Sequence, residues 1–120
     1  MQSKILIVDD EPDVLDVISK RLQAEGFSTV TAHDGIEGLL AAEREKPSLI
    51  LLDIMMPRRD GFTMLADLQT SDSLRRVPVI MVSAKAETDS LFEGQRIGAT
   101  DYIIKPIDFD ELLRYIRKYI

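Results

Sequence analysis

The chain has 120 residues and a formal net charge of −6, with 45% hydrophobic and 30% charged residues, which fits one soluble globular domain over 1–120. It has no cysteine and one histidine, His33, which excludes disulfides, thiolate catalysis and multi-histidine zinc sites, while the negative charge argues against holding a nucleic-acid backbone. No apolar run reaches membrane-spanning length and the start Met-Gln-Ser-Lys lacks the apolar segment of a signal peptide, so we expect a cytoplasmic protein that contacts no membrane.

The first half of the chain alternates short apolar runs with segments of helical periodicity. Residues 5–8 (Ile-Leu-Ile-Val) predict a buried strand, and a helix is predicted from Pro12 until Gly26. Residues 27–32 are partly polar, which is typical of a strand at the edge of a sheet. The segment from 35 to about 46 has leucines and alanines in a helical pattern.

The second half continues this alternation. Buried strands are predicted at 49–52, 79–82 and 102–104, and helices at 62–70, at 87–97 and from Asp108 to the C-terminus. The helix at 87–97 is the least firmly specified, because its apolar face is thin and Gly94 in its interior costs about 1 kcal/mol relative to alanine. It is therefore the helix that we expect to shift most easily.

Five strands that alternate with five helices predict an α/β fold. Such a pattern gives a parallel sheet with helices on both faces, and right-handed crossovers make the sheet doubly wound. The expected strand order is 2-1-3-4-5, because the second strand has the composition of an edge strand while the first and third are apolar throughout.

Polar side chains follow four of the predicted strands. They are Asp9 with Asp10, Asp53, Ser83 and Lys105. In an open α/β sheet the binding crevice lies outside the carboxyl ends of the strands, so we expect these side chains to converge there. Folding alone explains such a set poorly, although each residue by itself is common in loops.

The expected cluster suits magnesium-dependent phosphoryl transfer. Its three carboxylates and one lysine leave a local charge of about −2, which a divalent cation would cancel. Magnesium takes one or two carboxylates, keeps several waters and bridges to phosphate oxygens. With a lysine and a hydroxyl nearby, an aspartate can act as the nucleophile. Charge does not decide which aspartate attacks, but Asp53 is favoured because it ends a central strand between the acidic pair and Ser83.

These residues resemble the receiver domains of two-component response regulators. The resemblance covers Lys4 to Ile120 and fits the flavodoxin-like fold of that family. The matching motifs, in chain order, are Asp9-Asp10, Leu52-Asp53-Ile54-Met55-Met56-Pro57 with Asp60-Gly61, Ser83-Ala84, Gly98-Ala99 with Asp101-Tyr102, and Lys105-Pro106.

The resemblance implies a role for each matching residue at the site. Asp53 would accept a phosphoryl group from a histidine kinase or a histidine phosphotransfer protein. Mg²⁺ would be bound by Asp10, by Asp53, by the backbone carbonyl of Met55 and, partly through water, by Asp9. Lys105 would pair with the carboxylate and then with the phosphoryl oxygens, and its bond to Pro106 is expected to be cis.

The resemblance also implies a switch. Ser83 would move toward the phosphoryl group and Tyr102 would turn inward after it. We therefore expect the helix at 87–97, the last strand and the last helix to form the surface that controls a partner or output domain. The chain would phosphorylate and dephosphorylate itself without being an enzyme for an external substrate. A phosphorylation-dependent homodimer is left open.

Other functions fit the sequence less well. A phosphatase with an aspartate nucleophile would resemble Asp-x-Asp, but the second position here is Met55. A flavin-binding module would need a phosphate-binding loop after the first strand, where Asp9, Asp10 and Glu11 would repel the phosphate. The alternative that stays open is a receiver fold that serves as an interaction module without being phosphorylated.

Overall fold

The computed structural model describes residues 2–54, 56, 60–84 and 88–120, with the backbone alone at residue 60 and at 88–92. Its strands are β1 (Lys4–Val8), β2 (Ser28–Ala32), β3 (Leu49–Asp53), β4 (Val79–Ala84) and β5 (Asp101–Lys105). Its helices are α1 (Pro12–Ala24), α2 (Gly35–Glu45), α3 (Asp60–Thr70), α4 (Thr88–Ile97) and α5 (Phe109–Tyr119).

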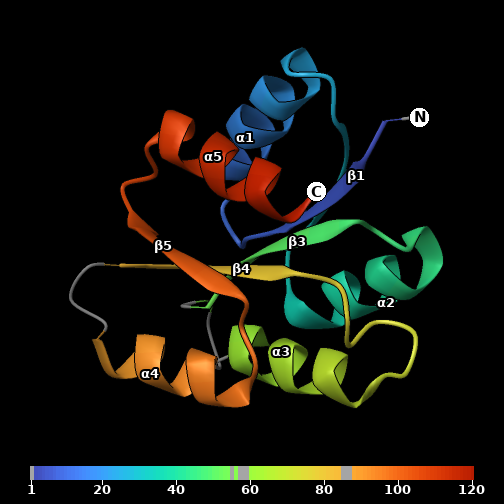
Figure 1. Cartoon of the computed structure of the whole chain (residues 1–120), viewed down its shortest axis with the longest axis vertical. Helices are drawn as coiled ribbons and strands as arrows, with labels where there is room; N and C mark the ends of the chain where they lie inside the picture. Colours follow the sequence, from blue (N-terminus) through green and yellow to red (C-terminus); the bar gives the residue numbers. More distant parts are fainter. Residues whose placement is uncertain (1, 55, 57–59, 85–87) are drawn as a thin grey trace.

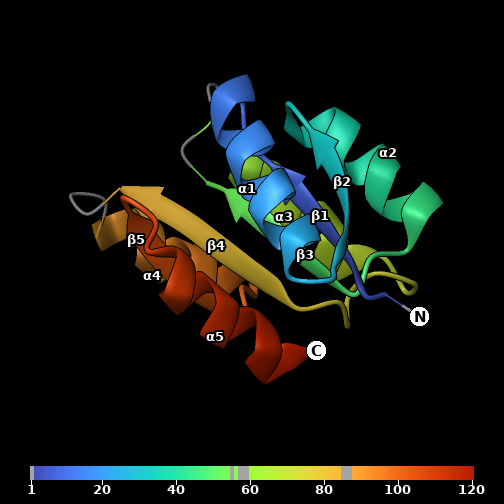
Figure 2. The same cartoon turned by 90° about the horizontal axis from the view of Figure 1, so that it is seen from above.

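The strands form one parallel sheet in the order β2-β1-β3-β4-β5, which confirms the predicted topology. Figures 1 and 2 show α1 and α5 on one face of the sheet, with α2, α3 and α4 on the other. The predicted edge strand, β2, is at the edge, and β5 forms the opposite edge. The protein is therefore an α/β doubly wound sheet of flavodoxin type.

Each face of the sheet has its own hydrophobic core. Successive strand residues point to opposite faces, so Leu6 and Leu52 pack toward α2 and α3 while Ile5 and Leu51 pack toward α1 and α5. The central strand β3 is buried along its whole length. Because both faces of this strand are covered, its sequence is continuously apolar until Asp53.

Four of the strands extend one or two residues further than predicted, whereas β2 begins one residue later, and the extensions of β3 and β4 matter for the site. Asp53 is the last residue of β3 and lies in register with Val82, while Ser83 lies inside β4. Ladder hydrogen bonding therefore fixes the backbone of both residues, whereas the sequence predicted them just beyond the strands. In the described part of the chain, no helix has the length and apolar character needed to cross a membrane.

Gly94 lies inside α4 as predicted, and the structure gives it a role in packing. It is buried, and an ideal Cβ built on it would overlap the Sδ atom of Met81 in β4. The glycine therefore allows α4 to lie close to the sheet, in addition to lowering the intrinsic stability of the helix. The expectation that α4 shifts most easily stays a prediction.

Candidate functional site

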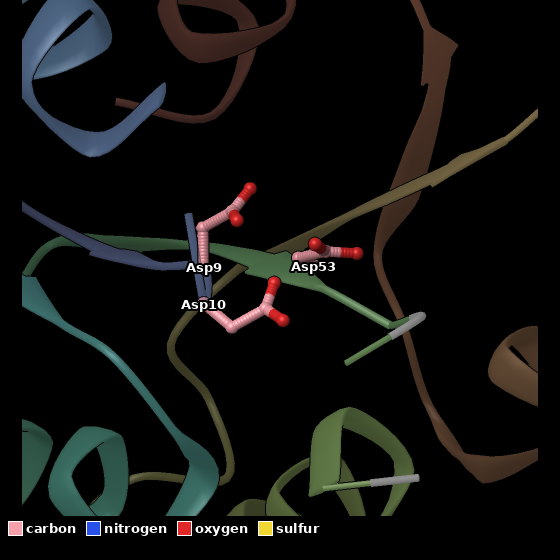
Figure 3. A group of neighbouring side chains, drawn as sticks. All are labelled: Asp9, Asp10 and Asp53. Atoms are coloured by element: carbon pink, nitrogen blue, oxygen red, sulfur yellow. The ribbon is translucent and has the colours of Figure 1, made fainter. Parts of the chain in front are cut away.

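Three carboxylates meet at the carboxyl ends of the two central strands. Asp9 and Asp10 directly follow β1, Asp53 ends the neighbouring β3, and Figure 3 shows the three side chains grouped there. One oxygen from each carboxylate can be chosen so that all lie within 4.8 Å of one another. Asp9 and Asp53 are each only 4% exposed, whereas Asp10 is exposed. The cluster is thus buried on one side and open on the other.

Lys105, the last residue of β5, reaches this cluster from the neighbouring edge of the sheet. Its Nζ atom donates a hydrogen bond to Oδ2 of Asp53 at 3.2 Å and lies 3.6 Å from Oδ2 of Asp9. Burial lowers the pKa of Lys105, but the charges of Asp53 and Asp9 outweigh it and raise the pKa above its usual value. The side chain is therefore a firmly charged ammonium group between two carboxylates.

Ionisation of the Asp9 carboxyl group is disfavoured at this site. Burial, helped by the negative charge of Asp53, raises its pKa from 3.8 to about 6. The backbone N–H of Glu11 donates to Oδ1 of Asp9 at 2.9 Å, and this bond and the charge of Lys105 act in the opposite direction. A cation beside Asp9 would relieve the electrostatic cost that remains.

The donor set fits a hard divalent cation. All three side chains offer oxygen, two of them are nearly buried, and the third faces solvent, where a metal keeps its waters. The backbone carbonyl of Met55, predicted as a further ligand, lies outside the described residues. The carboxylates alone would leave coordination positions for water or for another oxygen ligand.

Ser83 lies at the same end of the sheet but its hydroxyl is engaged elsewhere. It is fully buried, and its Oγ donates to the backbone carbonyl of the next residue, Ala84, at 3.3 Å. In this arrangement the hydroxyl is directed to the backbone of its own strand.

Tyr102 lies in β5, where it is half-buried against the core beneath α2, α3 and α4. Its backbone N–H donates to Oδ1 of Asp101 at 2.9 Å, and the other oxygen of that carboxylate accepts from the hydroxyl of Tyr119 at 2.8 Å. The peptide bond between Lys105 and Pro106 is cis, as predicted. Sequence reasoning missed the Tyr119 contact, since spacing alone does not reveal which tyrosine meets Asp101.

The role of Glu11 was also missed. Its contribution comes from the backbone N–H rather than from the side chain, so the residue type gives no signal. Its position could have been predicted, however. Residue 11 precedes Pro12 at the start of α1, and its N–H points back toward the end of β1. The structure thus adds a backbone donor to the predicted set of side chains.

Comparison with known proteins points to a single family. The model of the family described as "Response regulator receiver domain" matches residues 5–117. The chain is 38% identical over 114 residues to the "DNA-binding dual master transcriptional regulator RpaA" of Synechocystis sp., covering 95% of this chain and 47% of that protein. It is 42% identical over 113 residues to the "Uncharacterized transcriptional regulatory protein YkoG" of Bacillus subtilis, covering 94% and 49%. The chain spans about half the length of these relatives.

Solved structures give the same answer. Chemotaxis protein CheY4 of Vibrio cholerae superposes with a TM-score of 0.93 at 28% identity, covering 100% of both chains. The receiver domain of sensor histidine kinase PA1611 from Pseudomonas aeruginosa has a TM-score of 0.90 at 30% identity, covering 99% of this chain and 98% of that one. The latter structure is described with a magnesium ion coordinated in the active site cleft.

Proposed function

Because this chain belongs to the family of response regulator receiver domains, we propose that it accepts a phosphoryl group on Asp53 in a Mg²⁺-dependent reaction. The observation that carries the proposal is the arrangement of Lys105 between Asp53 and Asp9, at 3.2 and 3.6 Å, beside the exposed Asp10. In this arrangement Asp53 would be the nucleophile, Lys105 would be the cation for the phosphoryl oxygens, and Asp9 and Asp10 would be further oxygen ligands.

The reaction would convert the Asp53 carboxylate into an acyl phosphate. A carboxylate oxygen attacks phosphorus, the bond from phosphorus to the donor breaks, and the donor leaves with the electron pair of that bond. Lys105 already contacts Oδ2 of Asp53. Its ammonium group can therefore stabilise the negative charge on the phosphoryl oxygens without a large movement. Asp53 is favoured over Asp9, because Lys105 donates its hydrogen bond to Asp53 whereas the backbone N–H of Glu11 holds Asp9.

Asp9, Asp10, Asp53 and the backbone carbonyl of Met55 would hold the magnesium ion. When bound, the ion supplies charge neutralisation for the carboxylates and for the phosphoryl oxygens. The structure of the PA1611 receiver domain, described with a magnesium ion in its active site cleft, supports this choice of metal. Hydrolysis of the acyl phosphate by water would return Asp53 to its carboxylate, so the domain turns over its own phosphoryl group and is no enzyme for an external substrate.

The donor would be a histidine kinase or a histidine phosphotransfer protein, and one surface is suited to it. A pocket of about 670 Å³ opens beside the site, lined by Glu11, Asp13, Val14, Val17, Ile18, Arg21, Lys105, Pro106, Ile107 and Phe109. Val17 is 55% exposed in this lining, and Arg21 stacks on the ring of Phe109 at 4.0 Å. An apolar surface next to the acceptor suits a protein that must deliver a phosphoryl group to Asp53.

Phosphorylation would be transmitted to an output domain or effector. Relatives of about twice this length are named transcriptional regulators, which supports a regulator of this kind. The proposed route runs from Ser83 to Tyr102 and changes the surface of α4, β5 and α5. One possible output is a homodimer in which this surface contacts a second phosphorylated copy of the chain. The domain would work in the cytoplasm, where kinases have access to phosphodonors.

Intact mass tests the proposal. The wild type, Asp53→Ala and the exposed-site control Asp67→Ala are incubated with a small phosphodonor, with and without magnesium. We expect one phosphoryl addition in the wild type and in Asp67→Ala, in the presence of magnesium only, and none in Asp53→Ala. No addition to the wild type under any condition would favour the unphosphorylated interaction module instead.

A further inference from the structure

The packing of α4 on the sheet depends on a glycine and a methionine. Gly94 is buried in α4, and Met81 of β4 is fully buried beneath it. An ideal Cβ on Gly94 would overlap Sδ of Met81 and come within 2.7 Å of its Cε. The thioether therefore fills the space that any other residue at position 94 would claim.

Met81 is also next to Tyr102. The two residues are paired in the register of β4 and β5, and both pack into the core beneath α2, α3 and α4. Ser83 follows Met81 by two residues on the same strand, so its side chain points to the same face of the sheet. Gly94, Met81 and Tyr102 thus form a continuous set of neighbours from α4 to the edge strand, with Ser83 one pleat away.

We propose that Met81 is a positioning residue that couples the arrangement of Tyr102 to the position of α4. This inference rests on the proposed function, in which Ser83 and Tyr102 rearrange on phosphorylation. Protein interiors are close-packed, so a ring that turns toward β4, or a helix that moves on the sheet, must displace the Met81 thioether. Methionine is unbranched and flexible, and the bare surface of Gly94 leaves it room to change rotamer.

Substitutions on either side of this contact should move the switch in opposite directions. Gly94→Ala forces the thioether toward Tyr102 and should oppose inward rotation of the ring. Met81→Val shortens the side chain and should favour it. The double variant Gly94→Ala/Met81→Val should respond as the wild type does, because the shortened side chain no longer meets the added methyl group.

The measurement is fluorine NMR of the full chain labelled with 3-fluorotyrosine, with the Tyr102 resonance identified by its loss in Tyr102→Phe. Beryllium fluoride is titrated in the presence of Mg²⁺ as a stand-in for the phosphoryl group. Gly94→Ala should raise the midpoint of the Tyr102 response about threefold to tenfold, the range expected for residues that modulate coupling. Met81→Val should lower the midpoint.

Gly38 provides a matched control. It lies in α2, is buried, and an ideal Cβ on it would come within 2.7 Å of Sδ of Met64 in α3. Gly38→Ala therefore makes the same change against another methionine, at a place where Tyr102 is not the paired neighbour. Its thermal unfolding temperature is expected to change while the midpoint of the Tyr102 response stays at the wild-type value.

Three results would overturn the inference. Equal midpoints in the wild type, Gly94→Ala and Met81→Val would show that the contact does not bias Tyr102, and a shift in Gly38→Ala of the same size would show a general effect of helix packing. If Gly94→Ala does not fold, the inference is tested by the midpoints of the Tyr102 response in Met81→Val and in the volume-conserving Met81→Leu. A wild type that takes up no phosphoryl group and shows no Tyr102 response would identify failure of the proposed function, which removes the basis of the inference.

Discussion

At the scale of single residues, one carboxylate of the site, that of Asp9, is held at a cost in stability. Asp9 is 4% exposed, lies near Asp53, and has a pKa of about 6 against 3.8 in water. The folded state therefore binds a proton more tightly than the unfolded state between these two values. The metal-free domain should lose stability as the pH rises from about 4 to about 6, and regain it when a cation binds.

Replacing Asp9 by asparagine tests this directly. At pH 7 the free energy of unfolding of metal-free Asp9→Asn should exceed that of the wild type by about 2 kcal/mol, because the buried negative charge at position 9 is removed. Its stability should change less between pH 4 and 6. Denaturant unfolding at several pH values measures both effects. Asp67→Asn, at an exposed position in α3, should keep the wild-type pH profile. A less stable Asp9→Asn would contradict the raised pKa.

Lys105 should have opposite effects on metal binding and on chemistry. Its ammonium group lies 3.2 Å from Asp53 and 3.6 Å from Asp9, so Lys105→Met leaves the carboxylates with more net negative charge. We expect Mg²⁺ to bind a few-fold more tightly, and phosphorylation by a small donor to slow about tenfold or more, since the phosphoryl oxygens lose their cation. Titration calorimetry and the rate of mass addition give the two numbers. A parallel loss of both would indicate a collapsed site.

At the scale of elements, the sequence predicted best the strands whose burial is determined by hydrophobicity alone. The runs at 5–8 and 49–52 are buried on both faces, so hydrophobicity alone identified β1 and β3. Strand ends were less predictable, because polar residues such as Asp53 and Lys105 still take part in the ladder. The role of Gly94 in packing depends on its distance from Met81, which no local pattern contains.

The end of α5 that faces the site depends on a cap. Asp108 accepts hydrogen bonds from the backbone N–H groups of Asp110 and Glu111, through one oxygen, at 2.9 and 3.3 Å. Asp108→Ala should lower the free energy of unfolding by about 1 kcal/mol, and Asp108→Ser should recover most of it. Denaturant unfolding at pH 7 measures the difference. An unchanged stability would show that the cap contributes nothing in this context.

The clustering of the site residues was predicted, because the carboxyl ends of parallel strands lie at the same end of a sheet. Asp9, Asp10, Asp53 and Lys105 do meet there, and Ser83 lies at the same end of the sheet. The pairing of Lys105 with Asp53 was expected from the family resemblance, but the sequence does not determine side-chain rotamers. The second contact of Lys105, with Asp9, and the hydrogen bond from Ser83 to the Ala84 carbonyl were therefore not predicted. The Met55 carbonyl stays a prediction.

At the scale of the whole molecule, the two faces of the sheet are suited to different tasks. The pocket on the α1 and α5 side lies beside Lys105, whereas Tyr102 and Met81 pack on the side of α2, α3 and α4. Figure 1 shows these helix layers on opposite sides of the sheet. The proposed delivery surface and the proposed output surface would therefore begin on opposite faces of the sheet, and they share β5 and α5, whose residues Lys105 and Phe109 line the pocket.

A charged side chain in the pocket should slow phosphorylation by a protein donor without slowing phosphorylation by a small donor. Val17→Glu places a carboxylate in the apolar lining, and we expect phosphotransfer from a phosphorylated histidine protein that serves the wild type to slow about tenfold. Phosphorylation by a small donor should be unchanged, since Asp53 and Lys105 stay as they are in the wild type. Ile36→Glu, at a 77% exposed position in α2, is the control and should affect neither rate. Equal losses in both variants would place the donor elsewhere.

The position of the phosphoryl group tests the central claim most directly. After reaction of the wild type with a small phosphodonor and Mg²⁺, borohydride reduces an acyl phosphate to an alcohol and releases phosphate, so a phosphorylated aspartate becomes homoserine. Peptide sequencing by mass spectrometry should then find homoserine at position 53, and only in samples that contained both donor and magnesium. Homoserine at position 9 or 10, or a phosphoryl group on His33 with none at Asp53, would contradict the account.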